Sequence, residues 1–279
     1  MRIGWMISLL LAGAVCAQET SVEADLATAT RATIQKGFAF TLKPVVSMPD
    51  GFPQDRQALA GTTIVGEYSD GIYHARDGTY EIYKKGPLTL VRTERGWLPM
   101  DQYTSVMRQD VAQAFDDRDG RLWSRGNVTA GRKALQQLIQ LSHLNHRTNI
   151  GNLTRLEESI LDPKQIRGAT LNGKPAVLYE GEVAETTAFK ILQGPFETLV
   201  ERGNLAFRNV SGITRFYLQE GVIRRILVKV QGIYSTYEET DNTRRRGVCT
   251  LEISLDLTKH GEVKVELPRD AGPALKSVK

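Results

Sequence analysis

The fold is decided by the stretch Cys249-Thr250-Leu251-Glu252-Ile253-Ser254-Leu255-Asp256-Leu257 near the end of the chain. Every second residue is apolar and each residue between them is polar. Successive side chains of a strand point to opposite faces, so this strand has one apolar and one polar face. A sheet of such strands needs a covering layer on one side, which is typical of antiparallel sheets.

Neighbouring segments repeat this pattern. Glu220-Gly221 separates two alternating runs, and turn residues of this kind join adjacent antiparallel strands. A polar loop is predicted over 238–246, and His260-Gly261 precedes a last alternating run that contains Val263, Val265 and Leu267. The strands predicted in this half are 210–219, 222–234, 247–259 and 263–267.

The first half of the chain begins with helical spacing over 21–33 and then changes to a period of two, with Phe38, Phe40 and Leu42 on one face. Pro44 predicts that this strand ends there or lies at a sheet edge. Turn pairs such as Asp70-Gly71 then recur every few residues, which predicts an antiparallel meander. Its strands are 62–68, 72–75, 80–84, 88–92 and 97–98.

The middle of the chain is largely helical in pattern. An exception is a hairpin of 165–171 with 174–183 around Asn172-Gly173. The helical segments are the available cover for the apolar face of the sheet. Tight hairpin turns cannot join parallel strands, which argues against a doubly wound parallel sheet. These helical segments are 103–115, 133–144, 152–161 and 186–205.

Residues 1–17 have the features of a secretory signal peptide: a positive Arg2, a short apolar run and small residues before Gln18. We expect cleavage after Ala17 and a periplasmic or secreted protein. A retained signal anchor and lipid attachment at Cys16 are the alternatives. After cleavage Cys249 is the one remaining cysteine, so the chain is no disulfide-stapled scaffold, and its place in an alternating run predicts a small core residue.

Chemical motifs are weak. Gly168 to Lys174 has the spacing of a phosphate loop, but Pro175 stands where a hydroxyl residue is needed, so a hairpin is predicted there. His143 and His146 share a helical face without a third zinc ligand in the pattern, and His74 and His260 are interpreted as solvated. The sequence therefore predicts no catalytic residue, no cofactor and no metal.

The order of elements resembles that of the LolA/LolB-like lipoprotein-carrier superfamily, which includes LppX/LprG-type periplasmic lipid carriers. The resemblance is carried by the leader, a helix, the strand 37–46, the meander from Gly66, a helical block, the hairpin 171–181, a further helix and the closing strands 213–267. It implies an α+β fold in which helices cover a curved, unclosed antiparallel β-barrel, a half-barrel, whose hollow takes lipid. It also implies one domain over 18–268, followed by a C-terminal tail over 269–279.

Bulky apolar residues on the predicted strands are the candidates for lining this hollow, although plain core packing also explains each of them. The lead hypothesis is a non-enzymatic periplasmic carrier or chaperone that binds lipid or lipoprotein acyl chains. An envelope-associated protein-interaction domain with a filled core and a hydrolase with dispersed residues are the alternatives. The candidate ligand-binding residues are Phe38, Phe40, Ile82, Leu90, Trp97, Phe216, Ile226, Val228, Leu251 and Ile253.

The expected partners are a lipid or an acylated protein, with an envelope protein as a further possibility. The net charge of +4 is spread along the chain except at Arg244-Arg245-Arg246, which is too little clustering for nucleic-acid binding. No second long apolar run follows the leader, so no transmembrane span is expected.

Overall fold

The structure is a computed structural model. It describes residues 21–47, 62–94, 96–115, 153–196, 205–238 and 243–271, together with single positions between 134 and 145. The leader 1–17, the tail beyond 271, His143 and His146 lie outside the described residues.

The helices are α1 (Val22–Lys36), α3 (Met100–Phe115), α5 (Leu153–Glu158) and α6 (Glu185–Gln193), with the short 3-10 helices η1 (Gly194–Phe196) and η2 (Arg269–Ala271). The first strands are β1 (Phe38–Ser47), β2 (Ile64–Ser69), β3 (Ile72–Arg76), β4 (Glu81–Lys85), β5 (Leu88–Thr93) and β6 (Gly96–Pro99). The later strands are β7 (Ile160–Ile166), β8 (Thr170–Leu171), β9 (Lys174–Pro175), β10 (Val177–Val183), β11 (Leu205–Gln219), β12 (Val222–Glu238) and β13 (Thr243–Thr258).

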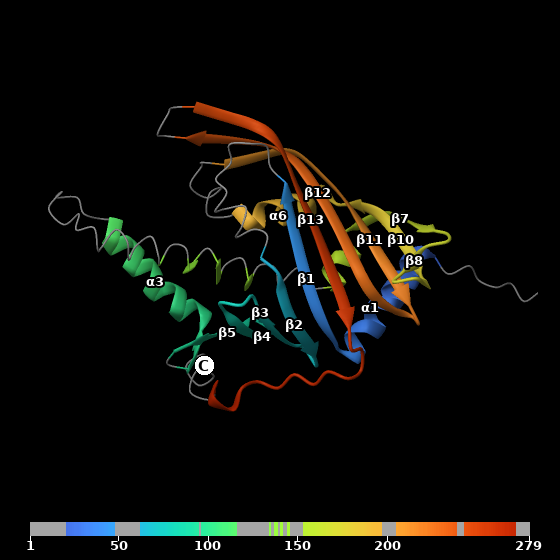
Figure 1. Cartoon of the computed structure of the whole chain (residues 1–279), viewed down its shortest axis with the longest axis horizontal. Helices are drawn as coiled ribbons and strands as arrows, with labels where there is room; N and C mark the ends of the chain where they lie inside the picture. Colours follow the sequence, from blue (N-terminus) through green and yellow to red (C-terminus); the bar gives the residue numbers. More distant parts are fainter. Residues whose placement is uncertain are drawn as a thin grey trace, which may run out of the picture.

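Within the described part of the chain, eleven strands form one sheet in the order β6-β5-β4-β3-β2-β1-β13-β12-β11-β10-β7. Each neighbouring pair is antiparallel. The edge strands β6 and β7 do not pair with each other, so the sheet is open. In Figure 1 the long strands β1, β13, β12 and β11 run side by side, and the meander β2–β6 lies at one end of them. The prediction of an α+β fold with an unclosed antiparallel sheet is confirmed.

The predicted hairpin turns are confirmed by backbone angles. Asp70 and Gly71 both have positive φ values, of 50° and 78°, and Asn172-Gly173 and Glu220-Gly221 show the same pattern. Two successive residues of positive φ form the tight turn whose twist matches that of the flanking strands. These turns set the register of β2 with β3 and of β11 with β12.

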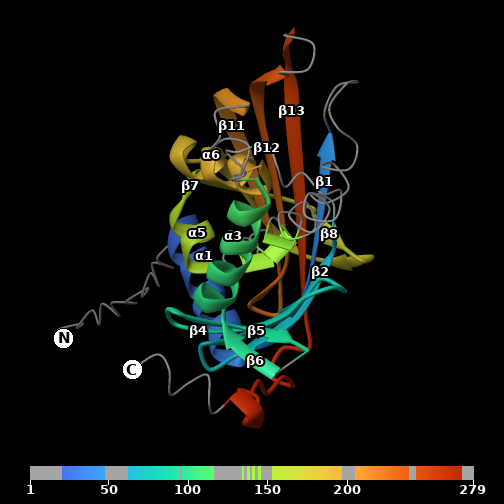
Figure 2. The same ribbon diagram turned by 90° about the vertical axis from the view of Figure 1, so that its left-hand side faces the viewer.

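Helix α1 begins where the side chain of Ser21 accepts a hydrogen bond from the backbone N–H of Ala24 at 3.2 Å, and it ends at Gly37. Its buried face includes Leu26, Ala29 and Thr33. The Thr33 hydroxyl accepts a hydrogen bond from the backbone N–H of Ile223 at the start of β12, at 2.9 Å. The views in Figures 1 and 2 place α1 and α5 on one side of the long strands.

Helix α6 packs on the same sheet through Ala188, Ile191 and Leu192, which are buried. Gly232 of β12 makes this approach possible, because a Cβ atom there would lie 2.8 Å from Cδ2 of Leu192. Among the described helices, none combines the length and apolar composition that crossing a bilayer requires.

The two faces of the sheet differ as the alternation predicts. On the inner face, Cys249, Leu251, Ile253, Leu255 and Leu257 are all buried in the main apolar cluster. On the outer face, oppositely charged residues stand directly opposite each other on neighbouring strands, an arrangement that stabilises a sheet. Three such ion pairs are Lys229–Glu252, Arg215–Glu180 and Arg225–Asp256.

Several predicted boundaries are wrong. The helix predicted to reach Leu161 ends at Glu158, and residues from Ile160 form the edge strand β7, because pairing with β10 overrides local helical spacing. Most of the predicted loop 238–246 is strand, since β13 already begins at Thr243. Of the helical segment predicted over 186–205, α6 and η1 account for the part up to Phe196, residues 197–204 lie outside the described residues, and Leu205 is already the first residue of β11.

The last predicted strand, 263–267, is wrong: these residues form no strand and lie outside the sheet. Both edges of β13 are already occupied, by β1 and by β12, so the segment that follows β13 cannot pair with β13 itself. Pro44 lies within β1, opposite Ile253 of β13. The pairing of β1 with β2 already ends at Leu42. The proline therefore lies where the β2 side of β1 is unpaired within the described residues.

Candidate functional site

The inner face of the sheet carries most of the predicted lining residues. Eight of them are buried in one apolar cluster, which also contains Leu26 of α1, Leu192 of α6 and Leu141. The structure therefore brings strands from both halves of the chain and residues of the helical segments to one apolar surface. These eight residues are Phe38, Phe40, Ile82, Phe216, Ile226, Val228, Leu251 and Ile253.

The structure does not bring Leu90 and Trp97 to this surface. They form a second buried cluster with Ala271 of η2, on the outer side of the meander. Val91 takes the inner position instead, because it is the register partner of Ile82 and both belong to the main cluster. Leu90 and Val91 are both apolar, so alternation alone did not distinguish the two faces of β5.

Two buried hydroxyl groups were missed by the sequence patterns. The side-chain oxygens of Thr30 in α1 and Thr214 in β11 have no hydrogen-bond partner in the described structure, although both residues are 1% exposed. Most buried polar groups in proteins are hydrogen-bonded. A polar atom of a bound molecule that reached either hydroxyl would therefore gain a hydrogen bond.

A polar cluster lies on the outer side of the meander. Glu81 lies between His74, whose Nε2 is 2.8 Å from Oε1, and Arg92, whose Nη1 donates to Oε2 at 2.8 Å. Burial opposes ionisation of Glu81, but the hydrogen bonds from Arg92 and His74 outweigh it and hold the pKa of this carboxyl below its ordinary value. His74 stacks on Tyr83, with ring centroids 4.5 Å apart.

Both histidines interpreted as solvated are in fact partly buried. The His74 side chain is 19% exposed, because it lies on Tyr83 and against Glu81. His260 lies at the end of β13, where its Nε2 is 3.0 Å from the carbonyl oxygen of Ile223 and its Nδ1 is 2.9 Å from Nη1 of Arg224. Since guanidinium can only donate, Nδ1 must accept, so the neutral tautomer carries its proton on Nε2.

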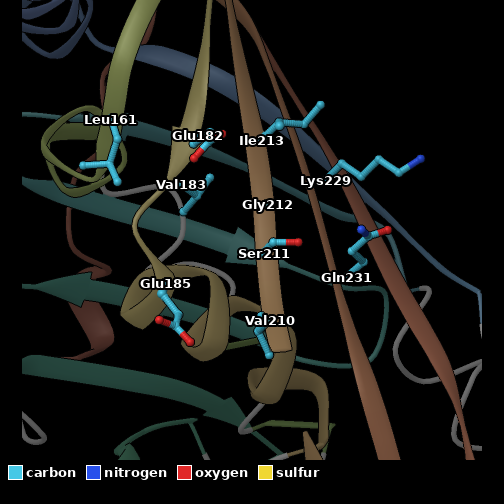
Figure 3. Close-up of a pocket in the computed structure, with 10 residues that line it drawn as sticks. All are labelled: Leu161, Glu182, Val183, Glu185, Val210, Ser211, Gly212, Ile213, Lys229 and Gln231. Carbon is cyan, nitrogen blue, oxygen red and sulfur yellow. The ribbon is translucent and has the colours of Figure 1, made fainter. Parts of the chain in front are cut away.

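A pocket of about 530 Å³ opens on the outer side of the sheet (Figure 3). It lies beside two register shifts, one in β10 between Glu180 and Glu182 and one in β11 between Arg208 and Ser211. Figure 3 shows the side chains of Lys229 and Gln231 on the same side as that of Ser211. Its lining residues are Leu161, Glu182, Val183, Glu185, Val210, Ser211, Gly212, Ile213, Lys229 and Gln231.

The lining of this pocket combines apolar and charged side chains. Its only described apolar residue of high exposure is Leu161, at 47%, and Lys229 already pairs with Glu252 on the neighbouring strand. A further pocket of about 790 Å³ lies between the meander and α3 and is lined in part by Tyr80, Leu98 and Tyr103. Across the described residues, no group of three or more histidine, cysteine, aspartate or glutamate side chains is placed to hold a metal ion.

Comparison with known proteins identifies no family. No protein-family model matches the chain, and no curated protein matches it. A solved structure described as lipid–protein interactions in lipovitellin aligns with a TM-score of 0.27 and 8% identity, over 84% of this chain and 26% of that chain. The chain thus spans about a quarter of the lipovitellin chain. A TM-score this low carries no argument about fold or function.

Proposed function

We propose that this protein is a non-enzymatic carrier that holds a lipid, or the acyl part of a lipoprotein, against the inner face of its open sheet. The observation that supports this best is the difference between the two faces. The inner face gathers Phe40, Phe216 and Ile253 into one apolar cluster with helix residues, whereas ion pairs such as Lys229–Glu252 cross the outer face.

Apolar burial alone suffices for such binding. Each buried CH₂ group contributes about 0.8 kcal/mol, so an acyl chain needs no specific polar contact to bind usefully. We further propose that the helices cover the ligand-binding face and separate from it to admit the chain. Helices α1 and α6 make the contacts that would change, through Leu26 and Leu192.

The test is titration of the purified, delipidated protein with a fluorescent fatty acid. We expect saturable binding and a higher melting temperature in the presence of ligand, because a ligand that binds the folded state stabilises it. Ile253→Asn should weaken binding, and Ser254→Asn, one position along on the polar face, should not. Absence of saturable binding by the wild-type protein would refute the proposal.

The fatty-acid titration includes a check on folding. Circular dichroism of both variants separates lost binding from lost structure. Should Ile253→Asn fail to fold, the shift in melting temperature of the wild-type protein still decides the question, since an unbound fatty acid leaves it unchanged.

We also propose that the protein is exported and is related to the LolA/LolB-like carriers. Export predicts that the mature protein begins at Gln18. Expression of the whole chain, followed by N-terminal sequencing of the periplasmic or secreted fraction, tests this. Retention of Met1 would contradict cleavage.

A protein-interaction role is the second candidate, because large apolar residues are exposed on the outer face. Val45 and Val248 are 62% and 55% exposed, and Leu161 lines the pocket in Figure 3. This function predicts that Val248→Asp abolishes capture of a protein partner and leaves fatty-acid titration unchanged. The carrier function predicts instead that capture of an acylated protein depends on the inner face and is unchanged by Val248→Asp.

A further inference from the structure

The pocket of about 790 Å³ beside α3 lies on the inner side of the meander. Leu98 of β6 lines it and is the register partner of Val91, which belongs to the main apolar cluster. Tyr80 and Tyr103 also line it; Tyr80 is part of the same cluster and Tyr103 packs against it. The pocket therefore adjoins the proposed ligand-binding face, and its size is typical of small-molecule sites.

Arg92 lines this pocket as well, but its charge is directed to the opposite side of the meander. Its Nη1 donates to Glu81 at 2.8 Å, and its guanidinium carbon is 6.0 Å from the centre of the Trp97 ring. Trp97 belongs to the second cluster, on the outer side of the meander. The positive charge of Arg92 is thus paired outside the pocket and is not available to a ligand within it.

The other charged residue of the lining is Glu94, an exposed residue in the turn between β5 and β6. Burial raises the pKa of Tyr103, and the nearby carboxylate of Glu94 adds to this effect. Asp77 does not line the pocket but is close enough to contribute, after burial and Tyr103, to raising the pKa of Tyr80. The field in the pocket therefore disfavours an anionic head group.

Tyr80 provides a hydrogen-bonding group without a partner. The residue is 7% exposed, and its hydroxyl oxygen is buried with no hydrogen-bond partner in the described structure. The hydroxyl of Tyr103 approaches it, but the pair does not reach hydrogen-bond geometry. Burial raises the pKa of Tyr80, so its phenol keeps the proton and can donate. Buried polar groups are seldom left unpaired, which indicates that a ligand atom completes this one.

The remaining polar residues of the lining are uncharged. Their hydroxyl and amide groups both donate and accept hydrogen bonds, as the hydroxyl group of a ligand does. Leu98 and Val106, which is 57% exposed, supply apolar surface beside them. The lining therefore matches a molecule with an uncharged hydroxyl head group and an apolar chain. These polar residues are Thr79, Thr93, Gln102 and Gln137.

We propose that this pocket binds the head group of the carried lipid, and that the lipid is an uncharged amphiphile with a hydroxyl head group, a fatty alcohol or a monoacylglycerol. The hydroxyl of the ligand accepts a hydrogen bond from Tyr80, and the acyl chain lies along the inner face of the sheet. Because the Tyr80 hydroxyl is buried, the ligand reaches it when α3 moves outward. This inference rests on the proposed carrier function and adds the chemistry of the head group.

The experiment is calorimetric titration of the delipidated full chain at pH 8 with four twelve-carbon probes: dodecanol, monododecanoylglycerol, dodecanoate and dodecyltrimethylammonium. We expect one or both uncharged probes to bind more tightly than the two charged ones. The comparison of dodecanol with monododecanoylglycerol shows which hydroxyl head group is preferred. Glu94→Gln should narrow the difference between the preferred probe and dodecanoate, because it removes a carboxylate that repels the anion.

Tyr80→Phe is the decisive variant. It should weaken binding of the preferred uncharged probe about fivefold, as loss of one hydrogen bond implies. Its melting temperature without ligand should equal or exceed that of the wild type, because the variant removes a buried hydroxyl that has no partner. Tyr83→Phe is the matched control, since Tyr83 lies on the outer side of the meander, stacked on His74. This control should bind every probe as the wild type does.

The outcomes separate the two levels of inference. If the wild-type protein binds none of the four probes, the carrier function itself is refuted. If a charged probe binds as tightly as the uncharged ones, or if Tyr80→Phe binds them as the wild type does, the head-group assignment is wrong and the carrier function stands.

Discussion

The hydroxyl oxygen of Ser69, at the end of β2, accepts a hydrogen bond from the backbone N–H of Val265 at 2.7 Å, although the two residues are 196 positions apart. Both residues are buried, and η2 follows a few residues later, with Ala271 against Leu90 and Trp97. The segment after β13 thus crosses the outer side of the meander and ties it to the long strands (Figure 1).

We expect Ser69→Ala to lower the free energy of unfolding by about 1–3 kcal/mol, because it leaves the buried N–H of Val265 without an acceptor. Urea denaturation measures the change. Ser254→Ala, on the polar face of β13, serves as the control and should change stability by no more than about 0.5 kcal/mol. Equal losses in the two variants would mean that the bond to Val265 contributes nothing.

Thr33→Val should lower the free energy of unfolding for a related reason. The Thr33 hydroxyl donates to the carbonyl of Ala29 at 2.7 Å and accepts from the N–H of Ile223 at 2.9 Å. Valine keeps the shape and leaves that buried N–H unsatisfied, at a cost of about 1–3 kcal/mol. Amide hydrogen exchange at Ile223 should accelerate in this variant. Thr28→Val loses only exposed hydrogen bonds, one to the carbonyl of Ala24 and one from Arg31, so Ile223 should exchange in this variant as in the wild type.

The contact of α6 with β12 predicts a compensating pair of substitutions. Gly232→Ala should destabilise the protein by about 1–3 kcal/mol, because the added methyl group meets the Leu192 side chain. Leu192→Ala alone should cost about 2–5 kcal/mol by leaving a cavity. In the double variant the new methyl group occupies space that the leucine vacated. The double variant should therefore lose less free energy of unfolding than the sum of the two single losses, by at least about 0.5 kcal/mol. Strict additivity would show that α6 does not pack at Gly232.

His260 predicts a pH dependence of stability. Burial, together with the nearby Arg224, lowers the pKa of His260 below its ordinary value of 6.5. Between the two pKa values the unfolded chain binds more protons than the folded one, so stability rises with pH there. Stability therefore falls as the pH drops below about 6.5.

Denaturation of wild type and His260→Gln between pH 7.5 and pH 5 measures this effect. The difference in stability between the two proteins should narrow as the pH falls, because the wild type alone loses the contribution of the neutral imidazole. A constant difference over this range would contradict the lowered pKa of His260 in the folded protein.

Cys249 should be unreactive in the folded protein. It is buried in the inner face, and burial raises the pKa of its thiol to about 12. At pH 8 about one thiol in ten thousand is then ionised, and only the thiolate reacts. In a Cys16→Ser variant, a thiol reagent should label Cys249 only after guanidinium is added. Rapid labelling without denaturant would show that the cluster around Cys249 opens readily.

Patterns within the sequence were enough to predict many of the elements. The alternation from Phe38 to Leu42 and the turn pairs at Asp70, Asn172 and Glu220 hold in the structure, because both depend on a few adjacent residues. Eight of the ten candidate lining residues also reach one cluster. Tyr103 of α3 also packs against this cluster and was not found, since α3 and the strands meet only in the folded chain.

The sequence by itself determined which segments are strands of one polar and one apolar face, because a period of two is a property of each strand alone. Only the tertiary structure decided that Val91 rather than Leu90 faces inward, and that Val263, Val265 and Leu267 have no place in the sheet. The register with the neighbouring strand sets which residues of a strand face inward. A segment joins a sheet only where it runs along an unpaired edge strand. Both depend on residues far away in the chain.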